Sequence, residues 1–247
     1  KSRISSSTAT NNNTDFIFNE ISPLCQNIID NFDVLLQDIQ KLNTRQLHAL
    51  PLDIKNLSHQ LTDERSSRHL SYMNEKRFLS AYTRYFMWWN LVRLTKVFSG
   101  FKDNAFDILQ DGSYCLDIGS GPLTVITALW LSRPELWTKK ITWYVMDLSS
   151  SIMSLGEEIY LSVVSKTIAK TQNQNIEPWK IIRIKGSLGT FIKNKVSFVS
   201  CANVFNEIFE DSNKPLEQLC KNYTENIFKY LEDKVESLIF IAEPGIP

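Results

Sequence analysis

The sequence predicts an α/β fold in which one parallel, doubly wound sheet follows a helical N-terminal region. A short apolar segment, 114–118, ends in a Gly-Ser-Gly turn and leads into a helical segment. Strand-like apolar segments then alternate with amphipathic segments as far as residue 247. Before residue 105, apolar side chains recur every three or four residues, which is typical of helices. A chain of 247 residues is long enough to bury a sizeable core.

Composition limits the kinds of function. The chain has 27 Lys and Arg and 27 Asp and Glu, so its formal net charge is zero. This argues against nucleic-acid binding through bulk charge alone, although a local basic face is compatible with it. No apolar run reaches membrane-spanning length, so we expect no membrane span. The four cysteines are far apart and form no Cys/His cluster, which favours core thiols, a reducing compartment and no metal site.

The N-terminal part divides into a flexible tail, 1–14, and a helical region, 15–104. Residues 1–14 are rich in Ser, Thr and Asn and are expected to be solvated. Apolar residues spaced as in a helix predict one amphipathic helix within 16–42, starting near Ser22-Pro23. We expect 48–51 to break it and a second helix to cover 52–61.

The segment 63–102 is the most unusual one, with eight Lys or Arg against three acids. Leu79, Tyr82, Phe86 and Trp89 share one helical face and are expected to be core. The basic side chains would then lie on the other faces, beside further aromatic residues. Such a helix can hold RNA phosphates and stack bases, and the alternative is a solvated helix with snorkelling arginines. The candidates for RNA binding are Arg65, Arg68, Lys76, Arg77 and Arg84.

Residues 105–247 are expected to form the α/β domain. The predicted strands are 114–118, 141–146, 180–185, 196–201 and 237–242. The predicted helices between them are 123–132, 149–164 and 216–231. In such a sheet the ligand lies at the carboxyl ends of the strands.

The residues at the strand ends predict a cofactor. Asp117 precedes Gly119-Ser120-Gly121, and these glycines let a ligand approach the backbone at a helix N-terminus. An acid before Gly-x-Gly looks more like the first motif of S-adenosylmethionine (SAM) methyltransferases than like a dinucleotide motif. Taken alone, the turn could also be a chance one.

Asp147 is the second specific signal. It follows the second strand, 26 residues after Gly121, where nucleotide-type folds place a carboxylate that accepts both ribose hydroxyls. Together with the glycine turn it favours a SAM-type site over a chance turn. Leu148 and Asn203, which follow the second and fourth strands, complete the predicted cofactor site.

The fourth strand end does not identify a catalytic residue. It has Ser200-Cys201-Ala202-Asn203, in place of the Asp/Asn-Pro-Pro-Tyr/Phe typical of enzymes that methylate nucleic-acid amines. Cys201 lacks the preceding proline and the activating neighbour that cytosine-C5 enzymes use. Glu207 could be a base, but a helix cap or a solvent-facing side chain is the simpler interpretation. The catalytic residues therefore remain unknown.

Several stretches between Leu50 and Pro247 also carry a family resemblance. They are Leu50-Pro51 to Leu61-Thr62-Asp63-Glu64-Arg65, Tyr72-Met73 with Arg77, Ala81-Tyr82 and Tyr85, Leu116 to Pro122, and Ala202-Asn203-Val204-Phe205-Asn206-Glu207-Ile208 with Ile241-Ala242-Glu243-Pro244-Gly245-Ile246-Pro247. They resemble the methyltransferase-like proteins associated with the small ribosomal subunit in bacteria and mitochondria. The resemblance implies a Rossmann-like class I SAM-methyltransferase fold, contact with small-subunit rRNA, and partners among ribosomal proteins or assembly factors.

The chain departs from that family in two respects. Leu123 stands where the family often has another glycine, and a side chain there is expected to crowd the cofactor loop. The family's cysteine cluster, thought to hold an iron–sulfur cluster, lies beyond Pro247, as do the last two strands of a complete sheet. We therefore expect a sheet truncated after the fifth strand, and an iron–sulfur cluster only in a longer form of the protein.

Three functional hypotheses follow. The favoured one is a methyltransferase-like, rRNA-binding factor for small-subunit assembly, in the mitochondrial matrix or, alternatively, in a bacterial cytoplasm. The second is an active SAM-dependent rRNA methyltransferase. The third is a small-molecule SAM-dependent methyltransferase unrelated to ribosomes.

Overall fold

The sheet is built from five parallel strands. The computed structural model describes residues 21–62, 73, 75–171, 175–205, 215–232 and 236–243. The strands are β1 (Tyr114–Ile118), β2 (Thr142–Asp147), β3 (Lys180–Lys185), β4 (Phe198–Ala202) and β5 (Leu238–Ala242), in the order β3-β2-β1-β4-β5. All four neighbouring pairs are parallel. The chain thus enters the middle of the sheet and winds outward on both sides, which confirms the predicted Rossmann-like fold class.

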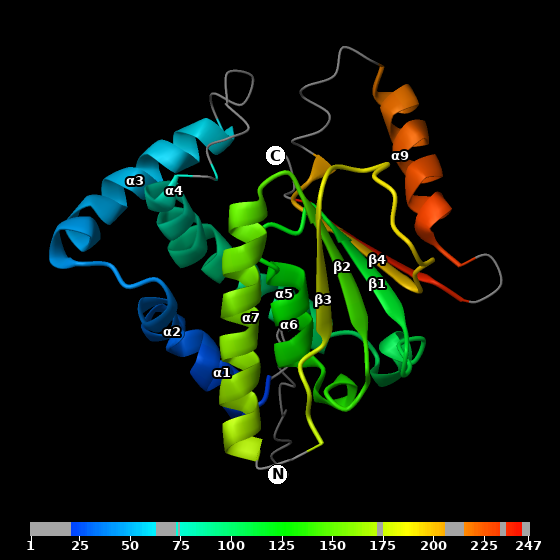
Figure 1. The fold of residues 1–247 in the computed structure, drawn as a ribbon, viewed down its shortest axis with the longest axis horizontal. Coiled ribbons are helices and arrows are strands. Elements are labelled where there is room, and N and C mark those ends of the chain that lie inside the picture. Colours follow the sequence, from blue (N-terminus) through cyan, green and yellow to red (C-terminus); the bar gives the residue numbers. More distant parts are fainter. Residues whose placement is uncertain are drawn as a thin grey trace, which may run out of the picture.

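Helices cover both faces of this sheet (Figure 1). On one face lie α5 (Trp88–Ser99), α6 (Thr124–Ser132) and α7 (Ser150–Thr171), and on the other lies α9 (Leu216–Tyr230). Side chains of α6 and α7 pack with Trp143 and Val145 of β2 in the larger hydrophobic cluster. Ile227 of α9 packs in a second cluster with Leu116 and Met146. The two faces of β1 and β2 are therefore both buried, as their apolar sequences predict.

The N-terminal helices are α1 (Pro23–Asp30), α2 (Phe32–Ile39), α3 (Thr44–Thr62) and α4 (Lys76–Ala81). Of these, α1 and α2 pack on α7, and α3 lies farther out beside α4 (Figure 1). Side chains from α1 and α2 belong to the same hydrophobic cluster as Trp130 and Tyr160. α1, α2 and the sheet consequently share one core, whereas Leu57 of α3 packs with Phe78 and Ala81 of α4 in a separate cluster.

Two helix predictions need correction. The start at Ser22-Pro23 agrees with the structure, because Ser22 Oγ accepts from the Cys25 N–H. The single helix within 16–42 is wrong, because Asn31 separates α1 from α2 and its side-chain amide donates to the Asn27 carbonyl. The break at 48–51 is also wrong, since α3 continues through Pro51. Leu57 of α3 is fully buried beside Phe78, so tertiary packing outweighs the local cost of proline.

A π-helix, Tyr82–Met87, joins α4 to α5 and changes which residues face the core. The wider turn shifts the helical register. Leu79 is buried, and Tyr82 and Phe86 are partly buried, but Trp89 is 44% exposed. Trp88 packs on the core instead, and its Nε1 donates to the Ile29 carbonyl at 3.1 Å. The prediction of a buried face is therefore wrong at Trp89.

Element boundaries in the α/β part differ little from the predicted ones. β1 and β3 match, whereas β4 starts at Phe198, after an isolated bridge between Val196 and Leu231. α7 continues to Thr171, beyond the predicted end at 164. Among the helices that the structure describes, none combines the length and the hydropathy needed to cross a membrane.

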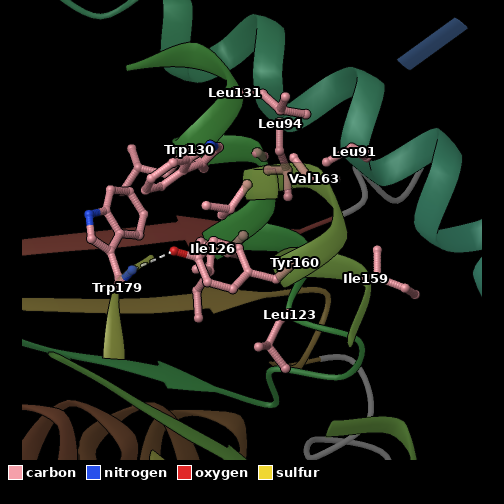
Figure 2. Close-up of a cluster of buried hydrophobic side chains, with 14 of the residues drawn as sticks. Leu91, Leu94, Leu123, Ile126, Trp130, Leu131, Ile159, Tyr160, Val163 and Trp179 are labelled. Atoms are coloured by element: carbon pink, nitrogen blue, oxygen red, sulfur yellow. Dashed lines mark hydrogen bonds between the residues drawn. The ribbon is translucent and has the colours of Figure 1, made fainter. Parts of the chain in front are cut away.

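An aromatic core fixes α6 and α7 against the sheet (Figure 2). The Tyr160 hydroxyl of α7 accepts from the backbone N–H of Trp179 at 2.8 Å, which ties α7 to the segment that leads into β3. Trp130 of α6 donates its indole N–H to Thr167 of α7 at 3.1 Å. These helices follow β1 and β2, so their packing positions the loops that leave the two strands.

Candidate functional site

The turn after β1 has a backbone that only a few residues adopt easily. Gly119 and Gly121 have φ of 64° and 48°, in the left-handed region that favours glycine. The Ser120 N–H donates to the Met146 carbonyl at 3.0 Å, so the turn is bonded to the end of β2. A Cβ on Gly121 would meet no atom within 4 Å, which leaves open space on that side of the turn.

Asp147 joins the two predicted motifs. Its Oδ2 accepts from the Gly121 N–H at 2.9 Å, across 26 residues of sequence, and its Oδ1 accepts from the Ser149 N–H at 2.9 Å. Burial raises the pKa of this carboxyl, while hydrogen bonds from the N–H groups of Ser149, Gly121 and Leu148 oppose the rise. The side chain of Leu148 is 48% exposed beside it. The structure thus brings Gly121, Asp147 and Leu148 together as predicted from their spacing.

Asp117 lies beneath the turn, with 1% of its surface exposed. Its Oδ1 accepts from the Ser200 hydroxyl of β4 at 2.7 Å. Its Oδ2 is buried and has no hydrogen-bond partner within the described residues, as is also true of the nearby Ser120 hydroxyl. Burial raises the pKa of Asp117 to about 7; the Ser200 hydrogen bond lowers it and the charge of Asp147 adds to the rise.

Leu123 does not crowd the cofactor loop, contrary to expectation. It has φ of 58° and immediately precedes α6. This leucine thus adopts a left-handed backbone, which glycine adopts more easily. Its side chain is fully buried within the larger hydrophobic cluster (Figure 2). Burial of a leucine side chain contributes about 2–3 kcal/mol, which offsets the cost of about 1–2 kcal/mol for a left-handed residue.

Asn203 directly follows β4 and, like Leu123, is a non-glycine residue with a positive φ, 59°. Its N–H donates to the Ala242 carbonyl of β5 at 2.8 Å. Next to it, the Glu243 carboxylate accepts from the backbone N–H groups of Val204 and Phe205. Glu243 enters the prediction from sequence only as part of the family motif, although an acid directly after a buried strand follows the same rule that identified Asp147.

Cys201 is unsuited to nucleophilic catalysis. Burial raises the pKa of its thiol to about 12, and the charges of Asp117 and Glu243 add to the rise. A thiol with this pKa forms almost no thiolate at neutral pH. Glu207, the other candidate from the sequence, lies outside the described residues.

The candidate RNA-binding residues fall into three groups. Arg65 and Arg68 lie outside the described residues. Lys76 and Arg77 are exposed, and Arg77 pairs with Glu75. They line a cavity of about 540 Å³ between the N-terminal helices and α7, to which Lys41, Asp53 and Glu158 also contribute. One further cation and two acids therefore line the same cavity as Lys76 and Arg77.

The prediction for Arg84 needs correction. Only 3% of its side chain is exposed. Its guanidinium donates to the Gln37 side chain at 3.0 Å and to the Gln40 carbonyl at 2.8 Å, and it pairs with Asp33 at 3.3 Å. Arg84 therefore fastens the π-helix to α2 and is not available to phosphates. An arginine in a basic stretch gives no sequence signal that distinguishes these two roles.

The strand-end residues fit SAM. The two oxygens of a carboxylate offer about four lone-pair sites, so Asp147 can accept from both ribose hydroxyls while it keeps its backbone donors. The open side of Gly121 and the buried, unpartnered Ser120 hydroxyl provide space and a polar group beside the turn. Within the described ranges no three His, Cys, Asp or Glu side chains are grouped to hold a metal ion. The iron–sulfur cluster stays a prediction from the family resemblance.

Comparisons with known proteins give structural similarity alone. No protein-family model matches this chain, and no curated protein matches it in sequence. One similar structure is a SAM-dependent methyltransferase from Geobacter sulfurreducens with S-adenosyl-L-homocysteine (16% identity, 62% of this chain, 46% of that chain, TM-score 0.36). Another, from Thiobacillus denitrificans with the same ligand, has 15% identity over 58% of this chain and 44% of that chain, with a TM-score of 0.33.

A third similar structure is the plantazolicin methyltransferase BpumL with S-adenosyl-homocysteine (17% identity, 78% of this chain, 61% of that chain, TM-score 0.41). The matched part of this chain spans less than half the length of the Geobacter and Thiobacillus proteins. Similarity at these identities and TM-scores does not identify a shared activity. What the chain itself contributes is a doubly wound parallel sheet with a SAM-compatible turn and carboxylate at its central strand ends.

Proposed function

We propose that this protein binds SAM at the carboxyl ends of β1 and β2. The observation that carries the proposal is the hydrogen bond between the Gly121 N–H and the Asp147 carboxylate. It places an acid suited to ribose hydroxyls directly beside a turn suited to close backbone approach. When bound, SAM would supply an electrophilic methyl group.

Each residue has a distinct part in this proposal. Asp147 accepts from the ribose hydroxyls. The turn 119–121 admits the amino-acid end of the ligand, because glycine backbone and the N-terminus of α6 lie there. Asp117 acts from below the turn, where its buried carboxylate supports a positively charged ligand without touching solvent.

Isothermal titration calorimetry with SAM and with S-adenosyl-homocysteine tests the proposal. The wild-type protein should bind both, and Asp147→Ala should abolish binding because it removes the ribose acceptors. Asp107→Ala, an exposed acid, is the matched control and should bind like wild type. Failure of the wild-type protein to bind at millimolar ligand would exclude the SAM site, and unchanged affinity in Asp147→Ala would exclude the ribose contact.

For the biological role we propose an rRNA-binding, methyltransferase-like factor in assembly of the small ribosomal subunit, in the mitochondrial matrix. The resemblance of Leu50 to Pro247 to that family supports it, and so does the exposure of Lys76 and Arg77. Its partners would be small-subunit rRNA with ribosomal proteins or assembly factors. Co-sedimentation with small-subunit precursors tests this role. Migration apart from ribosomal particles would instead favour a small-molecule methyltransferase, which the zero net charge supports.

An active rRNA methyltransferase is the second candidate. Asp117, Gly119, Gly121 and Asp147 support it, because the glycine turn and both strand-end acids are present. The high pKa of Cys201 weighs against thiolate chemistry and so favours a binding factor or an enzyme that methylates without a nucleophilic cysteine. Transfer of a labelled methyl group to small-subunit rRNA would separate the two.

A further inference from the structure

The acid at the end of β5 is bonded to the turn that leaves β4. Oε1 of Glu243 accepts from the Val204 N–H at 2.7 Å and from the Phe205 N–H at 2.9 Å. Hydrogen bonds from two neighbouring N–H groups to one carboxylate oxygen are charge-assisted. Such bonds are about twice as strong as neutral ones. Together with the hydrogen bond from the Asn203 N–H to the Ala242 carbonyl, they join the end of β5 to the turn after β4.

The same turn contacts the candidate cofactor loop. A Cβ on Gly119 would collide with Cγ2 of Val204, so the valine side chain lies directly against the Gly119 backbone. A backbone contact this close depends on where the Val204 main chain is held. Glu243 holds it, and Gly119 begins the turn that bonds to Asp147 through Gly121.

Oε1 of Glu243 makes both bonds to the turn. The second carboxylate oxygen, Oε2, is buried and has no hydrogen-bond partner among the residues that the structure describes. Burying such an oxygen is costly, and an apolar side chain would avoid the cost. The carboxylate also adds negative charge near the strand ends, where it raises the pKa of Cys201. The bonds to Val204 and Phe205, together with the contact of Val204 with Gly119, therefore point to a role toward the neighbouring turn.

We infer that Glu243 is a positioning residue for the cofactor site: it fixes the turn 203–205, which in turn holds Val204 against Gly119 and sets the shape of the cofactor loop. This inference rests on the proposed SAM site. Glu243 acts through Val204 and does not itself touch the ligand.

The test measures S-adenosyl-homocysteine affinity, because this ligand lacks the sulfonium charge and so reports loop shape more than charge. Glu243→Ala should weaken binding about tenfold or more, since both bonds to the turn are lost. Glu243→Gln should stay within about threefold of wild type, since the amide oxygen can accept the same two N–H groups. Val204→Ala should weaken binding as well, and the double variant should be no weaker than the worse single one.

Glu236→Ala is the matched control, because this exposed glutamate precedes the other end of β5. All affinities are measured well below each variant's unfolding temperature. A Glu243→Ala variant that is less stable but binds like wild type would show a structural role only and overturn the inference. Glu243→Gln as weak as Glu243→Ala would overturn it too, because charge and not the bonds to the turn would then matter. If wild type does not bind, the SAM site itself fails and this inference fails with it.

Discussion

At the scale of single residues, Asp117 is a buried acid whose ionisation opposes folding. Its carboxyl is 1% exposed, one oxygen has no partner in the described structure, and burial raises its pKa to about 7 from an ordinary value of 3.8. The native state therefore binds one more proton than the unfolded state between about pH 4 and about pH 7. Stability that is present at low pH is lost as the pH rises through this range.

Asp117→Asn should remove this pH dependence. For the wild type, the Asp117 contribution lowers the free energy of unfolding by about 4 kcal/mol between about pH 4 and about pH 8. The variant should show a smaller fall over the same range and should be the more stable protein at about pH 8. Urea unfolding at several pH values measures both. Equal slopes for the two proteins would contradict the prediction, because they would mean that Asp117 has nearly the same pKa in the native and the unfolded state.

SAM binding should shift the protonation equilibrium of Asp117 in the native state. The ligand carries positive charge, and an opposite charge favours the ionised carboxylate. Binding of SAM should therefore release protons near neutral pH in the wild type. Asp117→Asn should release fewer, which calorimetry in buffers of different ionisation enthalpy would reveal.

At the scale of elements, α7 approaches the cofactor turn through a glycine. A Cβ on Gly156 would collide with the backbone of Pro122, at the carbonyl carbon, Cα and carbonyl oxygen. A backbone cannot rotate away as a side chain can, so the helix or the turn would have to move. Gly156 thus lowers the helix propensity of α7 but lets this helix come close to the turn that follows β1.

Gly156→Ala should destabilise the protein although alanine is the better helix former. The propensity gain of about 1 kcal/mol is outweighed by overpacking against Pro122, which typically costs about 1–3 kcal/mol. SAM affinity should fall too, because Pro122 directly follows Gly121. Chemical unfolding and calorimetry measure the two effects. Ser151→Ala, at an exposed position of the same helix, is the control and should change neither stability nor SAM affinity by much. A Gly156→Ala variant more stable than wild type would contradict the close contact.

The elements also show what the sequence can predict. β1, its glycine turn and Asp147 were predictable because local signals agree there: apolar runs, turn glycines and a strand-terminal acid. The π-helix and the helical Pro51 were not, because long-range packing decides them. The prediction that Leu123 crowds the cofactor loop failed for a similar reason. The sequence indicates a side chain in place of glycine, but it does not indicate that this side chain is buried in the core. The Glu243 bonds depend on the pairing of β4 with β5, which sequence alone does not give.

At the scale of the whole molecule, α1, α2 and Leu79 of α4 are part of the same core as the sheet. α1 and α2 pack on α7, and the Ser149 hydroxyl, next to the candidate cofactor site, donates to the Met73 carbonyl at 3.4 Å. Lys76 and Arg77 at the start of α4 are exposed and lie near α7, where they line the cavity. A surface for RNA on α4 would therefore belong to a helix that packs, through Leu79, in the same core as the strands of the candidate cofactor site.

The charge-reversal variant Lys76→Glu/Arg77→Glu should weaken association with small-subunit rRNA and should flatten its dependence on salt. Each phosphate contact that is lost lowers the slope of log affinity against log salt by about 1. Lys166→Glu/Lys221→Glu makes the same change of charge at exposed positions on α7 and α9 and should have a much smaller effect. Filter binding over a range of salt concentrations measures both variants. Because the four positions are exposed, both proteins should fold, so a difference between them reports the RNA surface. Equal effects would indicate that only net charge matters, and that α4 is a solvated helix.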